Sequence, residues 1–418
     1  MNRTLKASVL GLAAAGLMTS SALAELSGDL RIISDMSNPA PRAVMESLAA
    51  DFGEMHPDLN IELESVDREA WKTQIRNALS ANPPDVVNWY AANRMLPYVD
   101  AGLFMDITDW WEAGDYDGLE SVRGALTIND RQWGVPYTYY QWGVYYREDI
   151  FNELGLSEPA TWEEELANCQ VIVDSGRACY TIGTKFLWTA GGWFDYLNMR
   201  TNGFDHHMAL ARGELSWTED EGVRQTFANW RELIDMGAFV ADHQSYSWQE
   251  ALPFFTDGEA TAYLMGNFAV AAMRDSGLTD DQIDFYQFPV ITAGLPQGED
   301  APTDTFHVPS GAQNVEAARA FLQFVTSADV QTRINNGDNL GQLPVNANSG
   351  VDADEFLEQG FEMLSGNAQG GVAQFFDRDF PAEMASVGME GLQEFMVFPD
   401  NLDDILERLE DARERIYN

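Results

Sequence analysis

Positively charged residues are scarce in this sequence. The 418-residue chain carries 24 Lys and Arg against 67 Asp and Glu, which gives a net charge of −43 at pH 7. Such a surface repels nucleic acid and anionic membranes, so we expect neither as a partner. The acidic residues are spread along the whole chain, as in a protein kept soluble in a salty medium, and they indicate no site by themselves.

Cysteine and histidine are scarce as well. Cys169 and Cys179 are the two cysteines of the sequence, and there are five His. In an oxidising compartment such a pair forms one disulfide that closes a short loop, and two free buried thiols are the alternative. Two Cys without a nearby His fall short of a zinc-ligand set, so we expect no metal or other cofactor.

No apolar run is long enough to cross a bilayer, which takes roughly 20 residues. The opening segment has Arg3 and Lys6, then a shorter apolar stretch, then a small-residue triplet that ends at Ala24. This layout predicts that residues 1–24 are a signal peptide cleaved after Ala24. The next residue is Glu25, whereas a lipid-anchored lipoprotein has Cys there. We therefore expect a free protein exported to the periplasm.

Sequence motifs of the common catalytic centres are missing too. There is no G-x-S-x-G elbow, P-loop, H-E-x-x-H or G-x-G-x-x-G pattern. Paired carboxylates could hydrolyse glycosides, but among 67 acidic residues a pair found by eye carries no information. We expect no enzyme.

Strand and helix patterns alternate regularly along the chain. Apolar runs at 29–34, 60–66 and 84–90 predict strands, and Val44 and Leu48 belong to an amphipathic helix between the first two. This βαβαβ order predicts an α/β fold with a parallel sheet covered by helices. The length and the 45% apolar composition indicate a globular protein of two domains.

Two kinds of helix start can be read from the sequence. Segments 161–164 and 218–221 both have Thr followed three residues later by Glu, which is the capping-box pattern. Asn314 precedes a third helical pattern as an N-cap. We expect helices to begin at all three places.

Aromatic residues are abundant, with 12 Trp, 14 Tyr and 23 Phe. Pyranose rings have apolar C–H faces flanked by hydroxyls, so their sites need flat aromatic faces beside polar side chains. Ligands of parallel α/β sheets bind beyond the carboxyl ends of the strands. The first and third predicted strands lead to Ser37, Asn38, Trp89 and Tyr90, although each of them taken singly could be an ordinary loop residue.

Four segments, in order along the chain, resemble the family 1 extracellular solute-binding proteins. They are "PPDVVNWYAANRMLPYVDAGLFMDITD" (83–109), "WGVPYTYYQWGVYYREDIFNELGLSEPATWEEEL" (133–166), "FFTDGEATAYLMGNFAVAAM" (254–273) and "FHVPSGAQNVEAARAFLQFVTSADVQTRI" (306–334). Together they extend over most of the chain. The resemblance is to maltose-binding-protein-like sugar receptors of ABC importers.

The resemblance implies a two-lobe periplasmic-binding-protein fold, in which each lobe has a mainly parallel sheet flanked by helices. Three hinge crossings are expected, near 137–141, 303–307 and 343–346. The implied N-terminal lobe is 25–138 plus 306–343, and the implied C-terminal lobe is 142–303 plus 346–418.

The resemblance also implies the residues of the ligand site. In the first lobe and at the crossings they are Ser37, Asn38, Trp89, Tyr90, Asn93, Arg94, Tyr140, Gln141 and Asp304. In the second lobe they are Trp188, Trp193, Asp195, Asn267, Phe268, Phe376, Asp377 and Arg378. A surface salt bridge is the alternative role for Asp377 and Arg378. Neighbours on a strand point to opposite faces, so Tyr139 and Tyr140 cannot both face the ligand, and we expect Tyr140 first and Gln141 second.

The implied function is that of a monomeric periplasmic receptor. It would trap a sugar (a disaccharide, glucoside or monosaccharide) between its lobes and deliver it to the membrane permease of an ABC importer. One alternative is a receptor for a non-sugar or anionic ligand, such as glycerol phosphate, a sulfonated sugar or a polyamine. The other is a secreted glycoside hydrolase.

Overall fold

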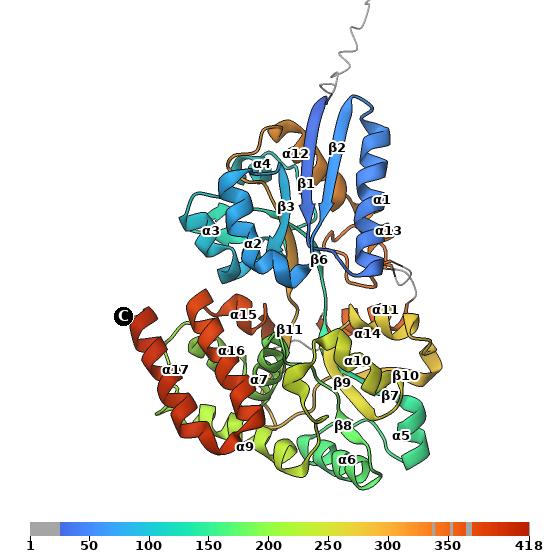
Figure 1. Ribbon diagram of the computed structural model, residues 1–418, viewed down its shortest axis with the longest axis vertical. Helices are drawn as coiled ribbons and strands as arrows, with labels where there is room; N and C mark the ends of the chain where they lie inside the picture. The colour runs from blue at the N-terminus through green and yellow to red at the C-terminus, as the bar shows by residue number, and fades with distance from the viewer. Residues whose placement is uncertain (1–25, 337–338, 352–353, 365–369, 418) are drawn as a thin grey trace, which may run out of the picture.

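The computed structural model describes residues 26–417 except 337–338, 352–353 and 365–369, and the predicted signal peptide lies outside this part of the chain. The described chain forms two α/β lobes, one above the other in Figure 1. Each lobe has its own sheet and its own hydrophobic core. No helix within the described ranges is long and apolar enough to span a membrane.

The first lobe is built on a five-stranded sheet in the order β2-β1-β3-β12-β6. Strand β1 is parallel to β2 and β3, while β12 is antiparallel to both of its neighbours, so β12 alone runs against the others. The strands are β1 (Gly28–Ser34), β2 (Leu59–Ser65), β3 (Val86–Tyr90), β6 (Val135–Tyr139) and β12 (Thr303–His307). The sheet is therefore mainly parallel, as expected.

Helices pack against this sheet through apolar stripes. Helix α1 (Pro39–Met55) buries Val44, Leu48 and Phe52, one turn apart, which is the predicted helical spacing. The other helices of this lobe are α2 (Arg68–Ala81), the short α3 (Leu96–Asp100) and α4 (Thr108–Glu112), α12 (Val315–Thr326) and α13 (Ala328–Ile334).

The second lobe has a four-stranded sheet in the order β10-β7-β9-β8. Here β7 alone is antiparallel to its neighbours, so this sheet too is mainly parallel. The strands are β7 (Trp142–Arg147), β8 (Ala178–Tyr180), β9 (Ala260–Gly266) and β10 (Ile283–Tyr286). The larger helices are α6 (Trp162–Asp174), α7 (Trp188–Asn202), α9 (Glu221–Met236), α10 (Trp248–Thr256), α16 (Ala382–Val397) and α17 (Leu402–Tyr417). Shorter ones are α5 (Glu148–Leu154), α8 (Phe204–Ala211), α11 (Ala269–Asp275), α14 (Glu355–Glu362) and α15 (Phe376–Asp379).

The chain passes from the first sheet to the second between β6 and β7, at Tyr140 and Gln141. It returns before β12, after the short strand β11 (Gly298–Asp300), which pairs with β13 (Gly371–Ala373) of the second lobe. The expected return at 303–307 is wrong, because all of β12 pairs with strands of the first sheet. The first lobe therefore resumes at Thr303.

The third crossing also lies later in the chain than expected. The Asn346 side chain donates a 2.9 Å hydrogen bond to the Thr326 carbonyl, and the Gly350 N–H donates to the Thr332 hydroxyl at 2.8 Å. These contacts keep residues 346–350 on the first lobe, so the expected crossing at 343–346 is wrong. The chain is on the second lobe by Asp354, which pairs with Arg274 at 2.8 Å.

All three predicted helices are present, and two of the three predicted caps are confirmed. Thr161 and Glu164 form a capping box at α6, and the Asn314 side chain caps α12. The capping box expected at 218–221 is wrong, since Asp220 caps α9 by accepting the N–H of Val223. Asp is as good an N-cap as Thr, and it stands nearer to the apolar stripe of the helix.

The predicted disulfide is present and joins α6 to β8. Cys169 and Cys179 are bonded, with their Cα atoms 5.1 Å apart. Glu165 lies one turn before Cys169 and is buried. It accepts hydrogen bonds from the hydroxyls of Tyr180 and Tyr286. Burial raises the pKa of Glu165 to about 7, although both hydrogen bonds oppose the shift.

Glu165→Gln tests this buried carboxyl. The pKa of Glu165 rises from 4.5 in the unfolded chain to about 7 in the fold, so its protonated carboxyl makes its full contribution to the free energy of unfolding below pH 4.5. That stability is lost as pH rises to 7, by about 3 kcal/mol at 1.36 kcal/mol per unit. We expect urea unfolding of the Glu165→Gln variant to lack this loss between pH 4.5 and 7. Equal pH dependence of variant and parent would contradict the assignment.

Candidate ligand-binding cleft

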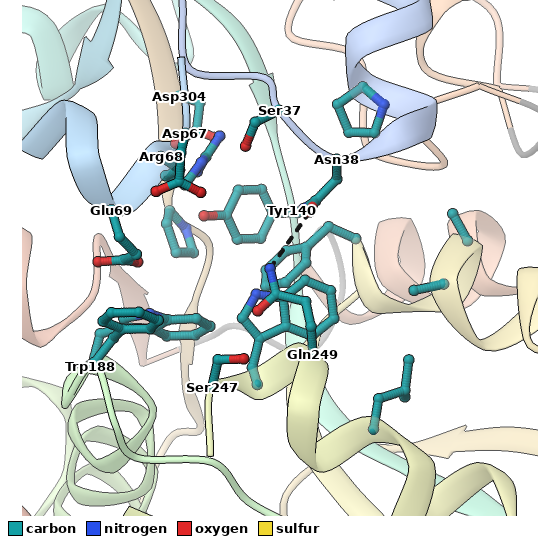
Figure 2. Close-up of a pocket in the computed structure, with 18 of the residues that line it drawn as sticks. Ser37, Asn38, Asp67, Arg68, Glu69, Tyr140, Trp188, Ser247, Gln249 and Asp304 are labelled. Carbon is teal, nitrogen blue, oxygen red and sulfur yellow. Dashed lines mark hydrogen bonds and ion pairs between the residues drawn. The ribbon is translucent and has the colours of Figure 1, made fainter. Parts of the chain in front are cut away.

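A cavity of about 660 Å³ lies between the two lobes (Figure 2). Its first-lobe lining includes Ser37, Asn38, Asp67, Arg68, Glu69, Lys72, Tyr90, Asp304 and Gln342. Its second-lobe lining includes Trp142, Lys185, Phe186, Trp188, Ser247, Trp248, Gln249, Glu250, Phe268, Asp275, Phe375, Asp377 and Arg378, and Tyr140 stands at the crossing. The volume is within the range of small-molecule sites.

The second lobe contributes a continuous group of aromatic rings. We call it the aromatic floor, and it consists of Trp142, Trp188, Trp248, Phe268 and Phe375. Ring centroids of Trp142 and Phe375 lie 4.7 Å apart, those of Trp142 and Trp188 5.9 Å, and those of Trp248 and Phe268 5.4 Å. Most of these pairs are edge-to-face or tilted, so each ring keeps part of a face for another partner.

Local backbone conformation places two rings of this floor. Leu187 has φ of +67° and Phe375 has φ of +105°, a region that costs a non-glycine residue on the order of 1–3 kcal/mol. Leu187 directly precedes Trp188, and Phe375 directly precedes α15. Gly192 lets α7 pack closely on the rings of Phe375 and Trp142, because a Cβ there would lie 3.0 Å from both. The surrounding packing therefore holds a strained backbone to present these rings.

The first lobe contributes polar groups opposite the floor. We call them the polar ceiling: Ser37 and Asn38 after β1, and Asp67, Arg68, Glu69 and Lys72 at the start of α2. In Figure 2 the labelled members of the ceiling lie above Trp188. Asp67 caps α2 by accepting the N–H of Ala70 at 2.9 Å. The rings of the cavity thus come mainly from the second lobe, whereas the first lobe contributes mostly charged and amide groups.

Asp304 is the most connected carboxylate of the cavity. It lies on β12, opposite Tyr90 of β3, and is buried. Its Oδ2 accepts from Arg68 at 3.3 Å, and its Oδ1 accepts from Arg378 at 2.9 Å. Arg68 also lies 3.6 Å from the buried Asp35. Burial raises the pKa of Asp35, and Arg68 opposes the shift.

Arg378 reaches from α15 into the hinge. It donates to the Thr303 carbonyl at 2.7 Å and to the Tyr140 hydroxyl oxygen at 3.0 Å, and its guanidinium lies 4.6 Å from the Tyr90 ring centroid. Burial raises the pKa of Tyr140, so its hydroxyl stays protonated. Because that oxygen already accepts from Arg378, its own proton is available to a ligand in the cavity.

The cations of the cavity lining are engaged with carboxylates. Besides Arg68 and Arg378, Lys72 pairs with Glu69 at 3.0 Å and Lys185 with Glu250 at 3.4 Å. Burial lowers the pKa of Lys72, while the charge of Glu69 opposes that shift. Carboxylates outnumber cations in the lining, so the cavity is not built to hold an anion.

The cavity brings together part of the expected site. The expected residues that line it are Ser37, Asn38, Tyr90, Tyr140, Trp188, Phe268, Asp304, Asp377 and Arg378. The expected residues that do not line it are Trp89, Asn93, Arg94, Gln141, Trp193, Asp195, Asn267 and Phe376.

Strand alternation explains two of the residues outside the cavity. Trp89 precedes Tyr90 on β3 and therefore points to the other face, where its indole N–H donates to the Arg94 carbonyl at 3.0 Å. Gln141 points away from the cavity beside Tyr140. Its amide donates to the Phe356 carbonyl at 2.9 Å, beneath Gly360 of α14.

Other expected residues lie in the core of the second lobe or make internal contacts. Trp193 packs edge-to-face on Tyr180, with centroids 4.7 Å apart, on a face of α7 turned away from Trp188. The buried Asp195 accepts the N–H of Phe376 at 2.7 Å, so both residues fix the start of α15. Asn267 instead connects the lobes beside the first crossing, since its side chain donates to the Gly341 carbonyl of the first lobe at 2.7 Å and its N–H donates to the Gln141 carbonyl at 3.1 Å.

Asn93 and Arg94 lie at the boundary of the lobes instead of in the cavity. The Asn93 amide donates to the Asp379 carbonyl at 2.7 Å. Arg94 lies 3.7 Å from Asp377 and 5.8 Å from the Trp89 ring centroid. Both residues therefore contact protein groups of the second lobe.

Sequence reasoning missed much of the lining. The missed residues include Asp67, Arg68, Glu69, Lys72, Trp142, Ser247, Trp248, Gln249 and Phe375. The start of α2 could have been found, because it follows β2 at the same sheet edge that directed attention to Ser37 and Tyr90. Trp248 lies within the Ser-x-x-Glu capping box that starts α10, but nothing in the sequence shows which way that helix faces.

One cluster of three possible metal-ligating groups occurs among the described residues: Glu165, Cys169 and Cys179. The two sulfurs are bonded to each other, so they offer no thiolate to a metal.

Comparison with known proteins agrees with this architecture. Residues 37–332 match the family model of the bacterial extracellular solute-binding proteins. An uncharacterized ABC transporter extracellular-binding protein of Pyrococcus horikoshii is 24% identical over 302 residues, which are 70% of this chain and 67% of that one. The multiple sugar-binding protein of Streptococcus mutans is 21% identical over 300 residues, 68% of each chain.

Among solved structures, the bacterial solute receptor AcbH superposes with a TM-score of 0.83 at 26% identity, covering 94% of this chain and 100% of that chain. AcbH is described as having an exclusive preference for β-D-galactopyranose. The family match extends over more than two thirds of the sequence. This chain belongs to the bacterial extracellular solute-binding proteins, with the two-lobe fold of that family.

Proposed function

We propose that this protein is a periplasmic receptor that binds a neutral sugar between its lobes and delivers it to the permease of an ABC importer. One observation carries the proposal: the aromatic floor of the second lobe faces the polar ceiling of the first. A pyranose ring would lay its C–H face on Trp188 and its neighbours. Its hydroxyls would then reach Asn38, Asp67 and Glu69 across the cavity.

The named relatives support a sugar as the ligand. The Streptococcus mutans relative is a multiple sugar-binding protein, and the AcbH receptor prefers β-D-galactopyranose. The pairing of Arg68, Lys72, Lys185 and Arg378 with carboxylates disfavours a phosphate or sulfonate group. A neutral monosaccharide or disaccharide is therefore the ligand class that fits the lining.

The expected residues that line the cavity are proposed as ligand contacts, together with the missed residues of the floor and ceiling. Contacts from both lobes exist at once only in the closed form, so a sugar that makes both sets stabilises closure. The hinge for this motion includes Tyr140–Gln141 and the segment just before Thr303. The permease would recognise the closed receptor, and a separate subunit would hydrolyse ATP.

The receptor performs no chemistry on the sugar in this proposal and needs no cofactor. We propose that it acts as a monomer and that residues 1–24 direct its export and are removed after Ala24. Mass spectrometry of the exported protein and its mass in solution would check these two points.

A thermal-shift screen tests the ligand class. A ligand at 100 times its dissociation constant should stabilise the fold by about 2.7 kcal/mol. We expect at least one neutral monosaccharide or disaccharide to raise the melting temperature, and glycerol 3-phosphate and spermidine to leave it unchanged. The sugar should be recovered intact by chromatography. A shift caused by amines or phosphates alone, or cleavage of the sugar, would refute the proposal.

Trp188→Ala tests the aromatic floor. The substitution removes the ring that lies beneath the ceiling, and we expect the dissociation constant for the sugar to rise at least about tenfold, or 1.4 kcal/mol. Trp110→Ala is the matched control, because Trp110 packs on Arg319 within the first lobe. Calorimetric titration of both variants measures the effect. Unchanged affinity in Trp188→Ala would show that the sugar does not rest on this ring.

A further inference from the structure

At the hinge, Arg378 contacts Asp304 and Asn267 contacts the Gly341 carbonyl. Away from the hinge, the lobes also touch directly along one lip of the cleft. There the short 3-10 helix η1 (Ala92–Arg94) of the first lobe meets α15 (Phe376–Asp379) of the second. We call the contacting residues Asn93, Arg94, Asp377 and Asp379 the α15 clasp. They are joined by the 2.7 Å hydrogen bond from Asn93 to the Asp379 carbonyl and by the 3.7 Å ion pair of Arg94 with Asp377. These contacts join protein atoms and need no ligand atom.

The opposite lip is joined more weakly. There Gln249 at the start of α10 donates to the Asn38 side chain at 3.4 Å, near the limit for a hydrogen bond and in an exposed position (Figure 2). In Figure 1 this lip lies below α1, whereas α15 lies on the other side of the molecule below α2 and α3. The two lips of the cleft are therefore unequal.

Surrounding contacts hold both elements of the clasp, η1 and α15, in place. Ala92 has φ of +53° and Phe375 has φ of +105°, so a strained residue starts η1 and another directly precedes α15. Such strain persists only where the surrounding contacts hold it. On the second lobe, Asp195 accepts the Phe376 N–H at 2.7 Å, and the rings of Phe376 and Phe380 stack with centroids 4.2 Å apart. A rigid α15 transmits its contacts to the whole lobe.

We propose that Asn93 and Arg94 are positioning residues of closure, whose contacts with α15 form when the lobes close and break when the cleft opens. The inference rests on the proposed sugar-binding function and deepens it. Because the clasp acts on the open–closed equilibrium, it scales the affinity for every ligand by the same factor. A residue that contacts the ligand would instead change the ratio of affinities between ligands.

The opening of the cleft can be measured without any ligand. Nitroxide labels on Ala43→Cys in α1 and Asp281→Cys in the second lobe span the α1–α10 lip, and both positions are exposed. The native cysteines are bonded to each other and do not react with the label. We expect pulsed EPR of Asn93→Ala/Arg94→Leu to give a longer and broader distance distribution than the labelled parent. Arg131→Leu, which breaks an ion pair with Asp106 inside the first lobe, is the control and should leave the distribution unchanged.

A second experiment measures the dissociation constants of two sugars that bind the unlabelled parent. Loss of one hydrogen bond and one ion pair should weaken binding of both sugars in Asn93→Ala/Arg94→Leu by the same factor, roughly tenfold. Asn93→Ala alone should give a smaller effect of the same kind. Unchanged EPR distances would overturn the proposed role of the clasp, whatever the sugar affinities are. A changed ratio between the dissociation constants of the two sugars would mean that these residues contact the ligand. If no sugar binds the parent, the proposed function fails, while the EPR result still decides the clasp.

Discussion

The carboxylate of Asp304 is the charge on which the cleft is organised. It is buried at the start of β12 and is shared by Arg68 of the first lobe and Arg378 of the second. A buried carboxylate is tolerated only when it is paired and hydrogen-bonded, and removal of a partner typically costs about 3–5 kcal/mol. The position of α2, the insertion of α15 into the hinge and the orientation of the Tyr140 hydroxyl all depend on this shared pair.

The two lobes contribute different kinds of side chains to the cavity. The first lobe must satisfy Asp304 and the buried Asp35, so polar groups gather at the start of α2. The second lobe also contributes charged groups to the cavity, but most of the rings come from it, and a strained backbone at Leu187 and Phe375 presents two of them. Arg378 contacts Asp304 at the hinge and brings α15 near the first lobe, so the contacts on the α15 side of the cleft are stronger than those between α1 and α10.

Predictions from the sequence succeeded where a property belongs to one segment. The strands near 29–34 and 60–66, the capping box at Thr161, the cap at Asn314 and the disulfide are local, and each was found. The capping box at 218–221 failed because Thr218 and Asp220, two positions apart, can both cap the helix, and Asp220 does so. The second and third crossings failed because pairing with a distant strand or helix, which no segment reveals, decides where a lobe ends.

The sequence by itself determined the family, the α/β class with two lobes and the covalent link between α6 and β8. It also determined four rings that line the cleft, Tyr90, Tyr140, Trp188 and Phe268. Only the tertiary structure decided which face each candidate presents. Alternation along β3 sends Tyr90 to the cavity and Trp89 away from it, and the register of that strand is fixed by its partners. Only the fold brings Arg68 next to Asp304, 236 positions away in the sequence. It also places Asn93 and Arg94, which were expected to contact the ligand, at the boundary between the lobes. Long-range contacts of this kind depend on the packing of whole elements, and the identity of single residues does not encode them.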